Sequence, residues 1–88
     1  MEIEIGRVTH YYNRIHVAVL MLSRVLRVGD EIRLQGQAVN FTQLVTFLEI
    51  NHTSVLWAQP GDNVALEVRQ PVREKDRVFR VLKNGPEP

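Results

Sequence analysis

The chain has 88 residues, of which 44% are hydrophobic and 24% are charged, and its formal net charge is +1. This length predicts one domain with one modest core, and so small a net charge does not by itself indicate a nucleic-acid partner. The absence of cysteine excludes disulfides and thiolate metal sites. The acidic N-terminus is unlike a signal peptide, and no apolar run approaches the roughly 20 residues of a membrane helix. We therefore expect a cytoplasmic protein without a membrane partner.

The first expected strand covers residues 2 to 11, because Ile3 and Ile5 alternate with two glutamates. Gly6 predicts a bend or bulge within it. The nearly continuous apolar run of residues 15–22 is typical of a strand that is buried on both faces. A helix over residues 17–27 is the alternative, although the valines and isoleucine of this run favour a strand.

Two turns of the same chemistry introduce the next clear strands. Gly29 and Asp30 precede the alternating run 31–35, and Gly61 and Asp62 precede the run 64–68. Glycine permits a positive φ and a short carboxylate can hydrogen-bond to nearby backbone, so both dipeptides predict tight turns. Each turn is expected to begin a half-buried strand.

Residues 40–50 predict a longer strand, although their apolar side chains recur every three residues as in an amphipathic helix. The β-branched and aromatic residues in this run favour the strand. A short strand at residues 55–57 and a last one at 77–82 complete the set. Together these short strands predict an all-β fold, either a small closed barrel or a sandwich, in one domain of residues 1–83 with a disordered tail at 84–88.

No catalytic pattern is present in the sequence. Ser23 and Ser54 lie outside any Gly-x-Ser-x-Gly motif, and the three histidines are too scattered for a metal motif. Neither of the usual glycine-rich phosphate loops occurs. We therefore expect a protein that is not an enzyme and that has no metal and no cofactor.

Two segments have the composition of binding sites. The first is an expected hairpin tip with rings and a guanidinium that can stack on bases or contact a protein: His10, Tyr11, Tyr12 and Arg14. The alternative is that the tyrosines cap one end of the barrel. The second is a basic segment from residue 69 to 83 that could follow a phosphate backbone: Arg69, Arg73, Lys75, Arg77 and Arg80. Its alternative is a solvated strand face that Glu74 and Asp76 partly neutralise.

A family resemblance rests on the order and spacing of several short motifs. Val28-Gly29-Asp30-Glu31-Ile32, Gly36, Glu49 and Gly61-Asp62-Asn63-Val64 together resemble the second domain of elongation factor Tu and related translational GTPases. Residues 6–11, 15–19 and 72–78 are similar to small stand-alone versions of that domain. A similar module is also attached to collagenase-like peptidases. The resemblance covers roughly residues 3 to 82.

The resemblance implies a six-stranded antiparallel Greek-key barrel of the translation elongation factor domain 2 type, without the GTPase domain. In elongation factor Tu this domain holds the aminoacylated 3′ end of tRNA in a shallow pocket. The glutamate and asparagine of that pocket fall at Glu49 and Asn63, and a family arginine falls at His52. These three residues are therefore a candidate nucleotide pocket.

Two functional hypotheses follow. The first is a non-catalytic, translation-factor-like module that contacts tRNA or ribosomal RNA through the basic segment and the candidate nucleotide pocket. The second is a protein-interaction adaptor that docks onto an enzyme or a translation factor, either by the end of the molecule that carries Tyr11 and Tyr12 or by a face of the barrel. The sequence does not name the partner.

Overall fold

A computed structural model describes residues 1–82, and the expected tail at 84–88 lies outside this part of the chain. Ten strands and no helix occur in it, so the all-β prediction is confirmed and a helix over residues 17–27 is excluded. Consequently, residues 1–82 contain no helix that could span a membrane. The strands are β1 Glu2–Tyr12, β2 Val17–Leu22, β3 Leu26–Arg27, β4 Glu31–Gln35, β5 Asn40–Leu44, β6 Leu48–Ile50, β7 Thr53–Val55, β8 Trp57–Ala58, β9 Asn63–Glu67 and β10 Arg77–Val81.

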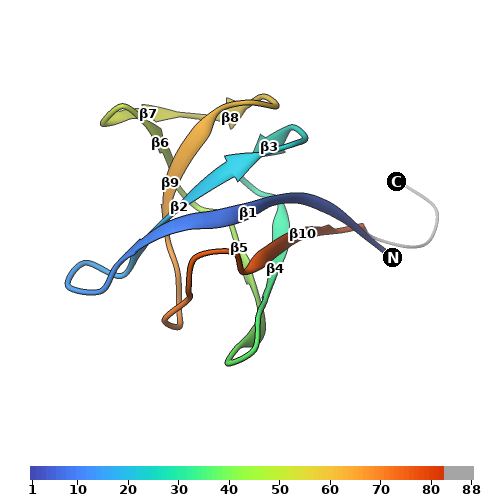
Figure 1. The fold of residues 1–88 in the computed structure, drawn as a ribbon. Helices are drawn as coiled ribbons and strands as arrows, with labels where there is room; N and C mark the ends of the chain where they lie inside the picture. Colours follow the sequence, from blue (N-terminus) through green and yellow to red (C-terminus); the bar gives the residue numbers. More distant parts are fainter. Residues whose placement is uncertain (83–88) are drawn as a thin grey trace.

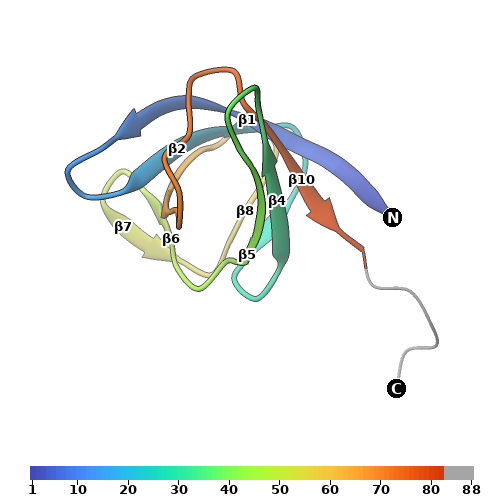
Figure 2. The same cartoon turned by 90° about the horizontal axis from the view of Figure 1, so that it is seen from below.

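Eight of the strands form one antiparallel sheet that wraps around the core (Figures 1 and 2). Its order is β5-β4-β10-β1-β2-β9-β6-β7, and β3 and β8 form a separate pair. Strand β1 is the longest and pairs with both β10 and β2. Its register shifts between Glu4 and Gly6, as the glycine predicted, and a Cβ at Gly6 would lie 2.4 Å from the carbonyl oxygen of Met21. The bulge therefore needs glycine.

The closed six-stranded Greek-key barrel is not confirmed. Within residues 1–82 the main sheet ends at β5 on one side and at β7 on the other, and no ladder joins these edges. The side chain of Gln43 bridges part of the gap instead, because its Nε2 donates to the Glu67 carbonyl at 2.8 Å and its Oε1 accepts from the Arg69 backbone N–H at 2.9 Å. A buried side-chain amide thus connects β5 to the end of β9 and to the residues that follow it.

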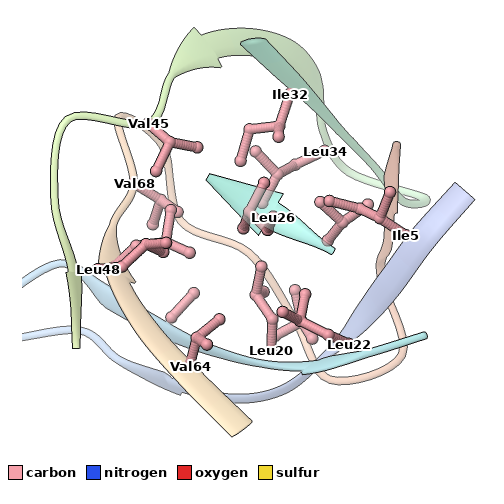
Figure 3. Close-up of a cluster of buried hydrophobic side chains, with 14 of the residues drawn as sticks. Ile5, Leu20, Leu22, Leu26, Ile32, Leu34, Val45, Leu48, Val64 and Val68 are labelled. Atoms are coloured by element: carbon pink, nitrogen blue, oxygen red, sulfur yellow. The ribbon is translucent and has the colours of Figure 1, made fainter. Parts of the chain in front are cut away.

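The core consists of aliphatic side chains on the inner side of the curved sheet (Figure 3). Alternate residues of each strand point inward, for example Leu20 and Leu22 on β2 and Ile32 and Leu34 on β4. Full burial of such a side chain contributes about 1.5–3 kcal/mol to the stability of the fold. Leu26 of the short β3, a strand that the sequence pattern did not predict, is fully buried as well.

Three turns share one geometry, and two of them are the predicted glycine turns. In each, the carboxylate of an aspartate accepts a hydrogen bond of 2.9 Å from the backbone N–H three residues earlier; the aspartates are Asp30, Asp62 and Asp76. The residue before each aspartate has a positive φ, which is 101° at Gly29, 93° at Gly61 and 76° at Lys75. The third turn therefore places a lysine where glycine is favoured.

The expected strand at 40–50 is interrupted. Strand β5 ends at Leu44 and β6 begins at Leu48, because Val45 turns into the core and bonds through its N–H and C=O to Asp30 and Gly29. The apolar spacing that resembled a helix thus spans two strands and the segment of residues 45–47 that connects them.

Candidate functional site

Two hairpins extend to the same side of the molecule in both views (Figures 1 and 2). In the first, Tyr12 of β1 pairs with Val17 of β2, so residues 13–16 form the loop. In the second, Ile50 of β6 pairs with Thr53 of β7, which leaves Asn51 and His52 as a two-residue loop. Both have positive φ, 51° and 65°, as a type I′ hairpin turn requires.

A pocket of about 470 Å³ lies beside these hairpins, and we call it the hairpin pocket. Cross-strand pairs place three residues in a row on the outer face of the sheet, because Ala65 of β9 pairs with Val19 of β2 on one side and with Glu49 of β6 on the other. Directly paired residues point to the same face. The lining residues are Tyr12, Ile15, Val17, Val19, Glu49, Asn51, His52, Asn63, Val64 and Ala65.

The structure places all three residues of the candidate nucleotide pocket around this one cavity. Glu49 comes from β6, His52 from the β6–β7 turn and Asn63 from the start of β9. Tyr12, which the sequence suggested as a partner contact, lines the same cavity. Two separate predicted sites therefore meet in one place.

The other aromatic residues of the first hairpin lie around this pocket without lining it. The ring of His10 contacts the ring of Tyr12 in a tilted arrangement, with 4.2 Å between centroids and 60° between the ring planes. Tyr11 packs against the core, and its hydroxyl lies 3.4 Å from Nδ1 of His16. Arg14 is exposed in the loop. Of the four predicted contact residues, Tyr12 is the one that lines the pocket.

Part of the predicted basic segment also comes together. Arg73, Lys75 and Arg77 line a second depression of about 520 Å³, and we call this the basic loop pocket. Glu74 and Asp76 line it as well, so two acidic residues lie among the three cations. The loop is held firmly, because Lys75 donates its N–H to the Val8 carbonyl at 2.7 Å and the Val8 N–H donates to the Asp76 carbonyl at 2.8 Å.

The remaining two basic residues lie elsewhere. Arg69 follows β9 and lines a different depression, and its guanidinium lies 3.5 Å from the carbonyl of Thr42. Arg80 donates to the Val25 carbonyl at 2.6 Å and is partly buried. The five residues therefore do not form one continuous face.

Two ion pairs lie on the outer side of β1, β10 and β4, and we call this surface the paired face. Arg33 pairs with Glu2, and Arg77 donates two hydrogen bonds to the Glu4 carboxylate at 3.0 and 3.2 Å. These bonds hold the pKa of Glu4 below its usual value. The Arg77 guanidinium also lies 5.0 Å from the centroid of the Phe79 ring.

The hairpin pocket contrasts with the paired face in its electrostatics. Glu49 is the one residue with a formal charge among the described residues that line it, and neither ion pair within residues 1–82 includes Glu49. Over the same residues, no group of three or more histidine, cysteine, aspartate or glutamate side chains could hold a metal ion. The pocket can supply hydrogen bonds, a carboxylate and apolar contact.

Sequence reasoning missed the apolar floor of this pocket. Val17 and Val19 belong to the run that predicted a strand buried on both faces, but both are only half-buried and Met21 is exposed. The expectation is wrong because β2 has the core on one side and the open pocket on the other. The sequence carried no signal for this pocket, because an apolar strand has the same pattern whether its outer face is buried or lines an open cavity.

Comparisons with known proteins agree with this fold. No protein-family profile matches the chain. A protein from Methanocaldococcus jannaschii that is described as an uncharacterized protease is 37% identical over 79 residues, which cover 89% of this chain and 19% of that protein. The chain thus spans about a fifth of the length of this curated relative.

Two solved structures have a fold similar to that of this chain. The C-terminal domain of a Geobacillus thermoleovorans protein described as a U32 peptidase matches with a TM-score of 0.84 and 22% identity, over 89% of this chain and 91% of that one. Its selenomethionine variant matches with a TM-score of 0.82 and 23% identity, over 85% and 95% of the two chains. These matches are consistent with the expected relation to peptidase-attached modules but do not show the resemblance to elongation factor Tu. The chain is therefore related in sequence to part of a larger protein described as a protease, and it shares the fold of a C-terminal domain of a U32 peptidase.

Proposed function

We propose that this chain is a non-catalytic binding module that docks onto a protein partner through the hairpin pocket. One observation carries the proposal: an apolar floor lies open to solvent between two hairpins, with Tyr12 and Ile15 exposed at its rim by 49% and 59%. Partly exposed aromatic and aliphatic side chains around a concave surface are typical anchors of protein interfaces. Protein docking would cover this surface.

The relation to larger proteins supports an adaptor role. In the M. jannaschii relative the similar segment is a fifth of a protein described as a protease, so a module of this kind can belong to the same molecule as a second domain. We propose that the present chain makes an equivalent association with an enzyme or translation factor.

The test is affinity capture from an extract of the cells that make the protein. Tyr12→Ala should remove the specifically bound partner because it deletes the largest side chain at the rim of the pocket. Trp57→Ala is the matched control, since Trp57 is 56% exposed but does not line the hairpin pocket. A partner that survives Tyr12→Ala and is lost with Trp57→Ala would contradict this assignment.

RNA binding is the second candidate, and the basic loop pocket favours it. Three cationic residues, Arg73, Lys75 and Arg77, line one depression on a firmly held loop, and such a group suits contact with phosphates of tRNA or ribosomal RNA. It ranks second because Arg77 already pairs with Glu4, whereas Arg69 and Arg80 lie elsewhere.

Fluorescence anisotropy with labelled bulk tRNA tests this candidate. Several phosphate contacts should make the affinity fall by orders of magnitude between about 50 and 200 mM salt. The double variant Arg73→Glu with Arg77→Glu should weaken binding and flatten its salt dependence. Binding that is unchanged in this variant would rule out the basic loop pocket as the RNA site.

A further inference from the structure

The hairpin pocket has a specific electrostatic requirement. Glu49 is half-buried at its edge, and its directly paired neighbours are Ala65 of β9 and Ser54 of β7, neither of which carries a charge. No lysine or arginine lines the pocket beside this carboxylate among the residues that the structure describes, and neither ion pair within residues 1–82 includes it. A ligand that covered the pocket with apolar groups alone would take this carboxylate out of water without a partner, which is costly.

We infer that the hairpin pocket binds an arginine side chain of the partner protein. This inference rests on the proposed docking function and names the chemistry of the docking residue. Glu49 would accept paired hydrogen bonds from the guanidinium, and the ring of Tyr12 offers a face on which the cation can stack. The methylene groups of the arginine would pack on Val17 and Val19, as long basic side chains do on apolar surfaces.

Other ligand classes fit this pocket less well. A phosphate or carboxylate would meet Glu49 and find no lysine or arginine among the lining residues that the structure describes. Lysine carries a more strongly hydrated point charge and lacks the planar fork, so it would lose more on leaving water and gain less from Glu49 and Tyr12. The side-chain carbonyls of Asn51 and Asn63, which line the same cavity, can accept further guanidinium hydrogen bonds.

An NMR titration tests the inference directly. The probe is a capped five-residue peptide with a central arginine between alanine and glycine residues, added to the ¹⁵N-labelled chain. We expect amide shifts confined to residues 12–19, 49–52 and 63–65, with a dissociation constant of roughly millimolar strength. The same peptide with citrulline, a neutral isostere of arginine, should bind at least about tenfold more weakly.

Variants of the chain complete the design. Glu49→Gln keeps the shape of the side chain and should reduce arginine-peptide affinity by about tenfold, which removes most of the preference for arginine over citrulline. The inference would be overturned if the unsubstituted chain bound the two peptides equally, or if Glu49→Gln left arginine-peptide affinity unchanged. Shifts confined to another surface, or no shifts up to about 10 mM peptide, would overturn it as well.

The failure of this inference can be told apart from failure of the docking proposal. The affinity capture is repeated with Glu49→Gln beside Tyr12→Ala. A partner that is lost with Tyr12→Ala but fully kept with Glu49→Gln would leave the docking function standing and overturn the arginine assignment. A partner that is kept by both variants would overturn the docking function itself, and loss with both supports the two together.

Discussion

The two outer faces of the main sheet use charge in opposite ways. On the paired face, Glu2 and Glu4 each form an ion pair with an arginine of the same chain. On the hairpin pocket side, Glu49 lies beside valines and an alanine, outside both ion pairs that residues 1–82 form. Charge content alone therefore does not mark a binding surface, whereas a carboxylate that lies outside any ion pair and beside exposed apolar groups is more informative.

The largest effect is expected from a variant that gives Glu49 a counter-charge within the chain itself. Ala65→Arg would place a cation directly across the ladder from Glu49 and fill the space above the valines. We expect partner binding to fall by more than tenfold, because the pocket then carries its own counter-charge, while the free energy of unfolding stays within about 1 kcal/mol of wild type. Affinity capture and urea unfolding measure the two quantities.

The matched control for that variant is Gln35→Arg, which adds the same side chain at an exposed position of β4 away from the hairpin pocket. It should leave partner binding unchanged. If both arginine variants reduced capture equally, added positive charge rather than occupation of the pocket would be the cause.

A second experiment measures how much the hydrogen bonds of Gln43 contribute to the free energy of unfolding. Gln43→Ala removes the amide that links β5 to the chain at Glu67 and Arg69, and leaves a backbone carbonyl and N–H without their partner. We expect a loss of about 1–3 kcal/mol in the free energy of unfolding. Gln43→Glu should also destabilise, since a carboxylate cannot donate to the Glu67 carbonyl. Stability equal to wild type in both variants would show that the bridge contributes nothing.

A third experiment compares the turns that lead into the two faces. Gly61 precedes β9 on the pocket side and Lys75 precedes β10 on the paired face, both with positive φ. Gly61→Lys should cost about 1 kcal/mol in the free energy of unfolding, and Lys75→Gly should gain somewhat less because glycine is also freer in the unfolded chain. Thermal unfolding would contradict this account if both changes shifted stability in the same direction.

The smallest expected effect concerns pH on the paired face. Because Arg77 lowers the pKa of Glu4 in the folded protein, this pair contributes stability above the unfolded pKa, and the contribution is lost as pH falls through the folded one. The difference in unfolding free energy between wild type and Arg77→Gln should therefore be small at pH 7, since the pair is solvent-exposed, and should shrink well below pH 4.5. Arg24→Gln, which lies outside both ion pairs, should show no such change.

Much of the fold could be predicted from residues with strong local preferences. The Gly29 and Gly61 turns, the bulge at Gly6 and the alternation of residues 31–35 all appear where the sequence placed them. Closure of the barrel could not be predicted from local sequence, because it depends on pairing between distant strands. In the structure, the Gln43 side chain of β5 hydrogen-bonds instead to the backbone of Glu67 and Arg69. The break at Val45 was missed because its partners lie in the turn at residues 29–30.

The candidate site was predictable only in part. The resemblance placed Glu49, His52 and Asn63 together, and the structure brings Tyr12 to the same cavity. Val17 and Val19 were missed because an apolar strand that is buried on both faces and one that lines an open pocket have the same sequence pattern. The basic segment looked continuous in sequence, but alternate strand positions and separate loops direct its arginines to different surfaces.

We propose that the hairpin pocket is the surface that contacts the partner protein. Site-specific photo-crosslinking in cells tests this proposal. A photoreactive residue at Ile15, which is 59% exposed at the rim of the pocket, is compared with one at Leu44, which is 60% exposed and does not line it. We expect a discrete protein adduct from position 15 and none from position 44. Adducts from position 44 alone, or equally from both, would contradict the claim.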